Sequence, residues 1–205
     1  MARTKQFDEA EILEKAMELF WKKGFHATSI QDLVAHLGIN RASMYSTFGS
    51  KEALFKEALK LYASQGSANP DALDAALTNT TARAFLEHFI LDRVQFTMQD
   101  CDRKGCFIVN TTTEMANLRQ DVNQEVCHNM TRAIATFSYV IEVGRTRGEV
   151  NNDAPTKVLA RHLYVFFSGL QVTAMLEQQY QNLYATVQQE LNWIFGGLGE
   201  NKKAD

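Results

Sequence analysis

The sequence lacks several features that would assign the chain to a common structural class. Only two of its 205 residues are proline, and three are cysteine, an odd number that does not suit a disulfide framework. No uninterrupted apolar run approaches the roughly 20 residues that cross a bilayer, and the first residues lack the apolar core of a secretory signal. We therefore expect a protein that stays in the cytoplasm and does not enter a membrane.

Motifs for catalysis and for metal binding are also missing. No phosphate-binding glycine loop, Gly-x-Ser-x-Gly or His-Glu-x-x-His pattern occurs, and the five histidines are scattered. No Cys-x-x-Cys spacing occurs, and adjacent Cys127 and His128 are poorly placed to share a metal on one helix. We therefore expect no enzymatic activity, no metal site and no cofactor.

Apolar residues recur at helical spacing over most of the chain. Hydrophobic residues make up 45% of the sequence, which is enough to bury a sizeable core. The spacing predicts an all-α fold. Besides short helices on either side of Gly38, we expect helices over residues 7–23, 51–66, 80–98, 106–116, 119–147, 155–180 and 183–195, with a break at 67–71.

Helix start and stop signals are concentrated between residues 28 and 55. Thr28 and Gln31 have the spacing of a capping box, and Gly38 can end the helix that they begin. Asn40 can cap a second short helix, and Ser50 can cap the helix that follows. Two short helices around a tight turn are the layout of a helix-turn-helix, which places one helix in the DNA major groove. The alternative is a helical hairpin that binds nothing.

The second short helix combines small side chains with hydrogen-bond donors. Small side chains let the backbone approach DNA closely, and the donors suit phosphates and base edges. We expect phosphate contacts from Thr28, Tyr45 and Lys51, and contacts nearer the bases from Arg41, Ser43 and Ser46. The full set of expected DNA-binding residues is Thr28, Ser29, Arg41, Ala42, Ser43, Tyr45, Ser46 and Lys51.

The same stretch resembles the TetR family of bacterial transcription regulators. The matching residues are Ala16-x-x-Leu19-Phe20, Gly24-Phe25, Thr28-Ser29-Ile30, Leu37-Gly38-Ile39 and Tyr45-x-x-Phe48-Gly49-Ser50-Lys51-Glu52-Ala53-Leu54. The resemblance is strong over roughly residues 5–62 and looser beyond. Many family members carry His or another aromatic residue where this chain has Ser46 and Thr47, so the operator sequence cannot be transferred from relatives.

The resemblance implies an N-terminal three-helix DNA-binding domain joined to a C-terminal helical domain for ligand binding and dimerisation. We therefore expect the helix-turn-helix domain in residues 1–50, a connecting helix in 51–66 and the second domain in 67–205. The last two helices are apolar around much of their circumference, which favours burial on more than one side. A homodimer through these two helices is the expected solution, and a deep monomer core is the alternative.

The resemblance also implies a small-molecule inducer bound between the middle helices. The residues expected to line its pocket are Phe89, Arg93, Phe96, Met115, Phe137, Phe166, Gln171 and Met175. Arg93 and Gln171 could orient a polar ligand, although an aromatic and methionine stripe is also typical of plain core. The expected function is a repressor that leaves a palindromic double-stranded operator when the inducer binds.

Two other modes of regulation stay open from the sequence. Cys106 follows a glycine near the expected start of a helix, beside Arg103 and Lys104, a setting that favours a reactive thiolate. It could sense electrophiles or oxidants with Cys101 as its resolving partner, or be a buried small hydrophobe. A switch operated by a protein partner is the remaining alternative.

Overall fold

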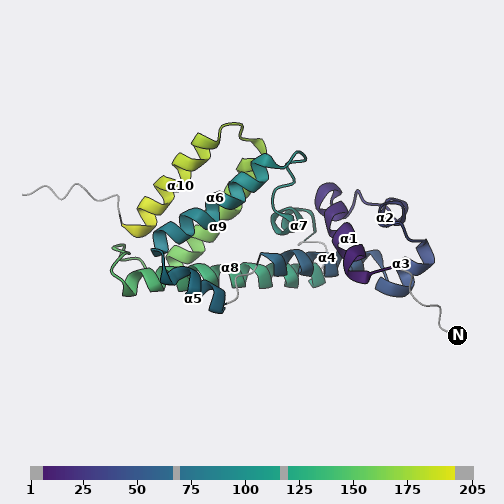
Figure 1. Ribbon diagram of the computed structural model, residues 1–205, viewed down its shortest axis with the longest axis horizontal. Coiled ribbons are helices and arrows are strands. Elements are labelled where there is room, and N and C mark those ends of the chain that lie inside the picture. The colour runs from purple at the N-terminus through teal and green to yellow at the C-terminus, as the bar shows by residue number, and fades with distance from the viewer. Residues whose placement is uncertain (1–6, 67–69, 116–119, 197–205) are drawn as a thin grey trace, which may run out of the picture. The chain divides into compact units, whose positions relative to one another are not determined.

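The computed structural model describes residues 7–66, 70–115 and 120–196. Within these ranges the chain forms ten α-helices and no strand, so the all-α prediction is confirmed (Figure 1). The helices are α1 (Glu9–Lys23), α2 (Ile30–Leu37), α3 (Arg41–Phe48), α4 (Lys51–Gln65), α5 (Pro70–Thr78), α6 (Ala82–Gln99), α7 (Phe107–Met115), α8 (Gln120–Thr146), α9 (Thr156–Leu176) and α10 (Tyr180–Phe195).

Three of the predicted helix signals around α2, α3 and α4 are confirmed. Gly38 follows α2 in the left-handed conformation, with φ 68° and ψ 22°. The Asn40 side chain caps α3 by accepting a hydrogen bond of 2.8 Å from the backbone N–H of Ser43. The Ser50 hydroxyl caps α4 by accepting one of 3.1 Å from Ala53. Local chemistry therefore sets the limits of these short helices.

Two helix limits in the second half of the chain differ from the sequence prediction. The predicted break at 67–71, of which residues 67–69 lie outside the described part, is followed by the unpredicted helix α5, which begins at Pro70. The missing N–H of proline suits the first turn of a helix. The predicted helix 155–180 ends at Leu176, because Glu177 is extended and its carboxylate accepts hydrogen bonds from the N–H groups of Gln178 and Gln179.

The chain divides into two compact units that are not contiguous in sequence. The first, the reading unit, comprises the described residues of Met1–Ser67 and Phe107–Asn129; the second, the core unit, comprises those of Ala68–Cys106 and Met130–Asp205. The sequence-based division placed everything after residue 66 in one domain. The structure instead groups α7 and the first turns of α8 with the reading unit, because their apolar side chains are buried among those of α1 and α4.

Aromatic rings form the centre of the reading unit. The ring of Phe55 on α4 makes edge-to-face contacts with Phe20, Phe25 and Phe107, at centroid distances of 5.0, 5.1 and 5.5 Å. Such pairs contribute about 0.5–1.5 kcal/mol each beyond the area that they bury. Phe20 and Phe55 are fully buried. The cluster therefore joins α1, α4 and α7 into a single support for α2 and α3.

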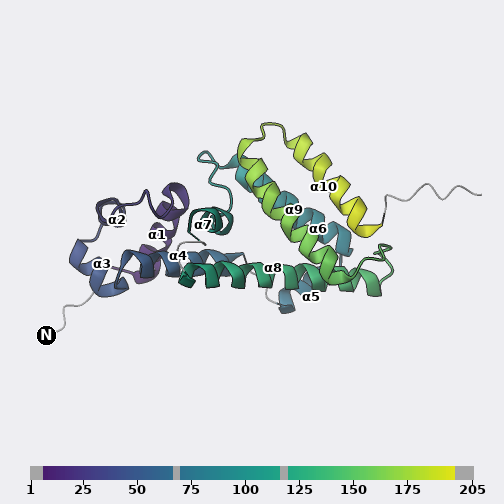
Figure 2. The same ribbon diagram turned by 180° about the vertical axis from the view of Figure 1, so that it is seen from behind.

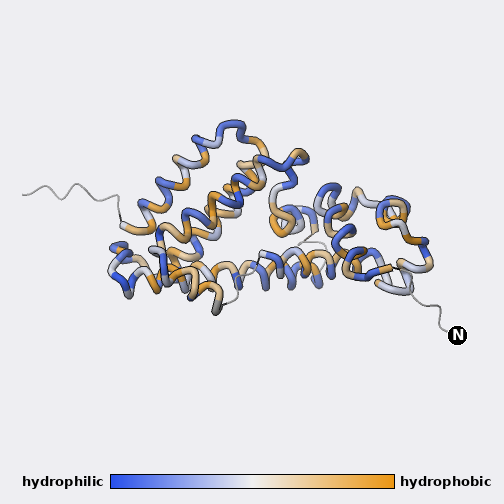
Figure 3. The backbone as a smooth tube through the Cα atoms, in the orientation of Figure 1, coloured by the Kyte–Doolittle hydropathy of each residue, from blue (hydrophilic) through white to orange (hydrophobic). Residues whose placement is uncertain are grey.

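The core unit is built on α6, α9 and α10, which lie side by side in both views (Figures 1 and 2). Leu86 and Ile90 of α6, Leu163 of α9, and Leu191 and Ile194 of α10 are fully buried in its core. Apolar and polar stretches alternate along these helices, as amphipathic packing requires (Figure 3). Among the described residues, no helix has both the length and the apolar composition needed to cross a membrane.

Candidate nucleic-acid interface

Helix α3 is anchored by one side chain and exposes the opposite face. Met44 is its single buried residue, with none of its surface accessible. Arg41, Ala42, Tyr45 and Ser46 are exposed. Their spacing places them on one side of the helix. We call these four residues the α3 face. The core thus holds α3 from one side and leaves its polar side chains open to solvent.

The α3 face offers several kinds of DNA contact. The guanidinium carbon of Arg41 lies 5.6 Å from the centroid of the Tyr45 ring, so the two longest side chains lie together. The Ser46 hydroxyl donates a 3.0 Å hydrogen bond to the carbonyl of Ser43, which is half-buried. Guanidinium and hydroxyl groups bind phosphate oxygens and base edges, and small residues between them allow close approach of the backbone.

The start of α2 is fixed by a capping box one residue later than the sequence predicts. The exposed Ser29, not Thr28, is the N-cap: its hydroxyl accepts a hydrogen bond of 3.0 Å from Asp32 N, and Asp32 Oδ2 accepts one of 2.9 Å from Ser29 N. The Lys23 ammonium lies 3.1 Å from Asp32. The hydrogen bonds from Ser29, together with Lys23, lower the pKa of the Asp32 carboxyl to about 2.

Thr28 does not have the role that the sequence predicts. The residue is fully buried, and its hydroxyl donates a 2.6 Å hydrogen bond to the carbonyl of Gly24. A phosphate could not reach this hydroxyl without opening the turn between α1 and α2. The predicted phosphate contact and the predicted cap are therefore both corrected: Thr28 closes the turn, and its neighbour Ser29 presents the exposed hydroxyl.

Lys51, at the first turn of α4, is half-buried next to the same turn. Its ammonium lies 4.2 Å from the centroid of the Phe25 ring, within the range of a cation–π interaction. Burial lowers the pKa of Lys51 below its usual value, and the nearby carboxylates, Glu52 first and then Glu114, oppose that shift. A phosphate contact from Lys51 remains a prediction.

A carboxylate from α7, which the sequence analysis did not identify, binds the turn between α1 and α2. Glu114 accepts a hydrogen bond of 3.0 Å from Phe25 N and one of 2.7 Å from His26 N. These partners lie 89 and 88 residues apart in sequence. No local pattern connects positions so far apart, so only the packing of α7 in the reading unit reveals the contact.

Three of the predicted ligand-binding residues share a hollow on α6. Phe89, Arg93 and Phe96 line it together with Asp92, and its volume is about 260 Å³. Phe96 is half exposed. Two aromatic rings with one guanidinium and one carboxylate could hold a small polar aromatic molecule against the helix.

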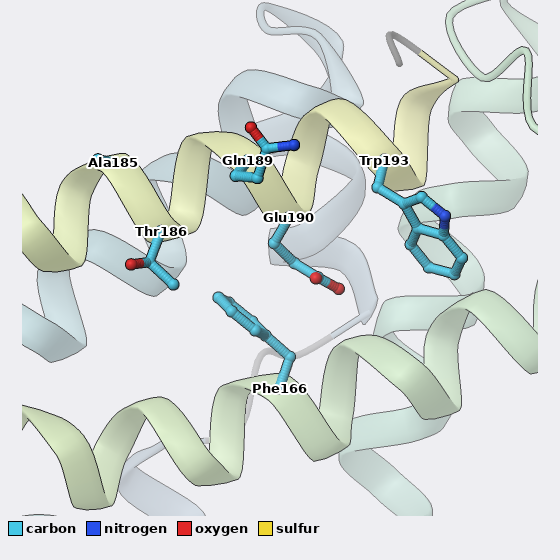
Figure 4. Close-up of a pocket in the computed structure, with 6 residues that line it drawn as sticks. All are labelled: Phe166, Ala185, Thr186, Gln189, Glu190 and Trp193. Atoms are coloured by element: carbon cyan, nitrogen blue, oxygen red, sulfur yellow. The ribbon is translucent and has the colours of Figure 1, made fainter. Parts of the chain in front are cut away.

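A second hollow lies between α9 and α10. Phe166 projects from α9 toward Thr186 and Glu190 of α10, and Trp193 also lines the hollow (Figure 4). The volume of this hollow is about 480 Å³. His162 Nε2 lies 3.0 Å from Glu190 Oε1. Burial raises the pKa of Glu190, an effect that His162 partly opposes. Of the predicted ligand-binding residues, this cleft contains Phe166 alone.

The remaining predicted ligand-binding residues do not converge on either hollow. Phe137 packs against Phe89 and Phe167 in the core unit, with centroids 6.0 Å away in each case. Gln171 is 7% exposed. Met175 lies against Gly105. Met115, at 1% exposure, belongs to the core of the reading unit. The aromatic and methionine pattern of the sequence therefore mixes hollow-lining residues with plain core.

The cysteines are dispersed. Cys106 is half-buried immediately before α7, and Cys101 and Cys127 are exposed. The cations that the sequence places beside Cys106 have partners of their own. The Arg103 guanidinium donates to the carbonyl of Glu177 at 2.8 Å, and the Lys104 ammonium lies 3.0 Å from Asp100. Across residues 7–66, 70–115 and 120–196, no group of three or more His, Cys, Asp or Glu side chains could hold a metal ion.

Comparison with known families agrees with this geometry over both units. Residues 12–58 match the family model described as bacterial regulatory proteins, tetR family. Residues 82–189 match the model described as tetracyclin repressor-like, C-terminal domain. The first match covers α2 and α3 entirely, and the second covers most of the core unit and α7.

Individual relatives span most of the chain. The uncharacterized HTH-type transcriptional regulator YezE of Bacillus subtilis is 32% identical over 168 residues, which are 80% of this chain and 84% of YezE. The HTH-type transcriptional repressor ComR of Escherichia coli is 28% identical over 172 residues, 84% of this chain and 81% of ComR. A cysteine mutant of the TetR family regulator CifR, solved with a 26 bp double-strand operator, has a TM-score of 0.78 and 26% identity, and the match covers 93% of this chain and 98% of CifR. This chain therefore belongs to the TetR family and is a DNA-binding transcriptional regulator.

Proposed function

We propose that this regulator is a repressor that binds a palindromic operator as a homodimer and leaves it when a small molecule binds the core unit. The observation that carries the proposal is the α3 face, held on one side by buried Met44 and open on the other. ComR is described as a repressor, and the CifR structure contains operator DNA. The same role for this chain follows by similarity.

The proposed DNA contacts come from three elements of the reading unit. The α3 face and half-buried Ser43 would approach the bases in the major groove, with Tyr45 reaching a phosphate. Ser29 at the start of α2 and Lys51 at the start of α4 would hold phosphates on either side. The proposed set is Ser29, Arg41, Ala42, Ser43, Tyr45, Ser46 and Lys51.

The exposed side of α9 supports the proposed homodimer. Val158, Val165, Val172 and Leu176 are 54%, 65%, 45% and 79% exposed, although they are apolar. With His162 and Gly169, they follow a regular 4-3-4-3-4 spacing, which is the spacing of a helix–helix seam. We call these six residues the α9 seam. An added Cβ at Gly169 would meet nothing within 4 Å, so a second helix could approach closely there.

The cleft between α9 and α10 would be covered in the same dimer. Trp193 at its edge is 37% exposed, and its ring centroid lies 4.4 Å from that of His162 in the α9 seam. A second copy packed on α9 and α10 would bury these rings together with the seam. Two copies would also present two α3 faces. One short recognition helix binds weakly by itself, and two together give useful affinity for a twofold operator.

The hollow on α6 is the proposed inducer site. Its rings and charges, Phe89, Phe96, Asp92 and Arg93, suit a small molecule with an aromatic part and a polar group. The ligand would favour the conformations in which the two α3 faces no longer match adjacent major grooves. A useful response needs a coupling free energy of roughly 1–3 kcal/mol between the two sites.

Selection from a random duplex library with the purified full chain, at a fixed salt concentration, tests the proposal. We expect an enriched palindrome whose half-sites lie roughly 34–36 Å apart, and two chains bound per duplex. A folded protein that enriches no sequence would contradict the proposed sequence-specific binding to an operator. The enriched duplex then serves to screen small molecules that release it, and release by the active compound should be lost in Arg93→Ala.

A further inference from the structure

One carboxylate of α7 contacts the backbone of the turn between α1 and α2. Glu114 Oε2 accepts a hydrogen bond of 3.0 Å from Phe25 N, and Oε1 accepts one of 2.7 Å from His26 N. Both carboxylate oxygens are thus used by consecutive N–H groups. Hydrogen bonds of this charged type are roughly twice as strong as neutral ones. The carboxylate also lies over Gly24, where an added Cβ would come within 2.9 Å of it.

Further hydrogen bonds lie within the turn. Gly24 ends α1 with φ 79°, and its own N–H donates to the carbonyl of Phe20. The Thr28 hydroxyl closes the turn from inside by donating to the Gly24 carbonyl at 2.6 Å. Glu114 closes it on the side of α7. The chain between the end of α1 and Ser29, the cap of α2, is therefore fixed by local hydrogen bonds on one side and by a residue of another helix on the other.

The same turn supports Lys51. The ring of Phe25, whose N–H donates to Glu114, lies 4.2 Å from the Lys51 ammonium. Glu114 is one of the carboxylates that raise the pKa of Lys51 against the effect of burial. A shift of the Glu114 side chain would consequently move two proposed phosphate contacts, Ser29 through the backbone and Lys51 through the Phe25 ring.

We infer that Glu114 is a positioning residue for operator binding: it fixes the turn of residues 24–28, and through it Ser29 and Lys51, without touching DNA. The inference rests on the proposed function. It assigns α7 the role of setting the geometry of the DNA-reading helices. A change in the position of α7 would therefore change operator affinity without any change in the α3 face.

The charge of Glu114 and its positioning role predict opposite changes in DNA affinity when the side chain is neutralised. A carboxylate close to a DNA-binding surface repels phosphate, so its neutralisation alone should tighten binding to every duplex. In Glu114→Gln, one oxygen becomes an NH₂ group that faces a backbone N–H, and one of the two hydrogen bonds is lost. Positioning therefore predicts weaker binding to the operator, even though the protein becomes less negative.

The test compares wild type, Glu114→Gln and the matched control Glu57→Gln by fluorescence anisotropy. Glu57 also lies in the reading unit and pairs with Lys60 of the same helix, at 2.8 Å, so its change removes the same charge without touching the turn. Each protein is titrated with the selected operator and with a scrambled duplex at one salt concentration. We expect Glu114→Gln to bind the operator up to about 10-fold more weakly, because binding must then order a turn that has lost one charged hydrogen bond, and to bind the scrambled duplex no more weakly than wild type.

Operator binding by Glu114→Gln as tight as wild type, or equal losses on both duplexes, would overturn the inference. Thermal unfolding checks that the variant is folded. Should it be unfolded, Glu114→Asp carries the test, because it keeps the charge on a side chain too short to reach both N–H groups. Weaker operator binding by Glu114→Asp than by wild type supports the positioning role, and operator binding as tight as that of wild type overturns it. A wild-type protein that selects no operator overturns the proposed function as well.

Discussion

The α3 face and the α9 seam are both exposed sides of helices, but their chemistry differs. The α3 face carries Arg41, Tyr45 and Ser46, whose polar groups suit phosphates and base edges. The α9 seam carries Val165 and Leu176, which are 65% and 79% exposed and suit another apolar helix. The contrast teaches that exposure alone does not define a surface: the polar α3 face suits DNA, as proposed, and the apolar α9 seam suits the proposed second copy of the chain.

The two surfaces are also held in different ways. α9 packs along its length into the core unit, with Leu159 and Leu163 fully buried. α3 has a single buried anchor, Met44, and a side-chain cap from Asn40. Its position therefore depends on few contacts and on the neighbouring turn. Small changes near α3 should alter DNA binding, whereas exposed positions of α9 outside the seam should tolerate substitution.

The largest loss of operator affinity is expected from a change in the apolar surface, the α9 seam. Val165→Arg places a charge in the middle of the α9 seam, where the proposed dimer would bury it without a partner. We expect monomers in sedimentation and a loss of operator affinity of about 100-fold or more, because the two α3 faces no longer act together. Lys157→Glu, an exposed change on the same helix outside the seam, should leave the dimer intact. A Val165→Arg protein that sediments as a dimer would contradict the assignment.

A smaller loss of operator affinity is expected from a change in the polar surface, the α3 face. Tyr45→Ala removes the largest side chain of the α3 face and the ring that lies beside the Arg41 guanidinium. We expect operator binding to weaken by about 10- to 100-fold, which corresponds to roughly 1–3 kcal/mol, with sedimentation and unfolding unchanged. Tyr45→Phe keeps the ring and isolates the contribution of the hydroxyl. Unchanged binding by Tyr45→Ala would mean that α3 is not the recognition helix.

The smallest effect concerns how α2 is held. The pKa of Asp32 is lowered to about 2 in the folded chain, below the value of about 3.9 that an unfolded aspartate has. Ionised Asp32 therefore stabilises the fold above about pH 4, and this contribution disappears as the pH falls toward 2. Asp32→Asn should lower the unfolding midpoint at pH 7, and the difference from wild type should shrink between about pH 4 and pH 2. A difference independent of pH would contradict the capping role of the charge.

Sequence patterns predicted those features of the reading unit that depend on neighbours in the chain. Gly38, Asn40 and Ser50 end or cap their helices as the sequence indicates, because each acts on backbone groups a few residues away. The prediction of which of two adjacent hydroxyls caps α2 was wrong. Thr28 and Ser29 are both suitable caps, and tertiary burial of Thr28 decides in favour of Ser29.

Features that depend on distant segments were not predictable in the same way. Glu114 binds a turn 88 and 89 residues earlier, and Met115 is buried in the reading unit although its place in the sequence suggests the second domain. Among the expected ligand-binding residues, Phe89 and Arg93 share a hollow, whereas Phe137 is packed in the core. Periodicity identifies a buried face but does not tell which other element covers it.

The most direct test of DNA reading by the α3 face is operator selection carried out in parallel with wild type and Arg41→Gln. Guanidinium and amide groups prefer different bases, because the first donates to guanine and the second exchanges hydrogen bonds with adenine. We expect the enriched sequence to change at one position in each half-site, symmetrically, and to stay the same elsewhere. The same enriched sequence for both proteins, at equal affinity, would contradict the placement of Arg41 at the bases and with it the assignment of the α3 face.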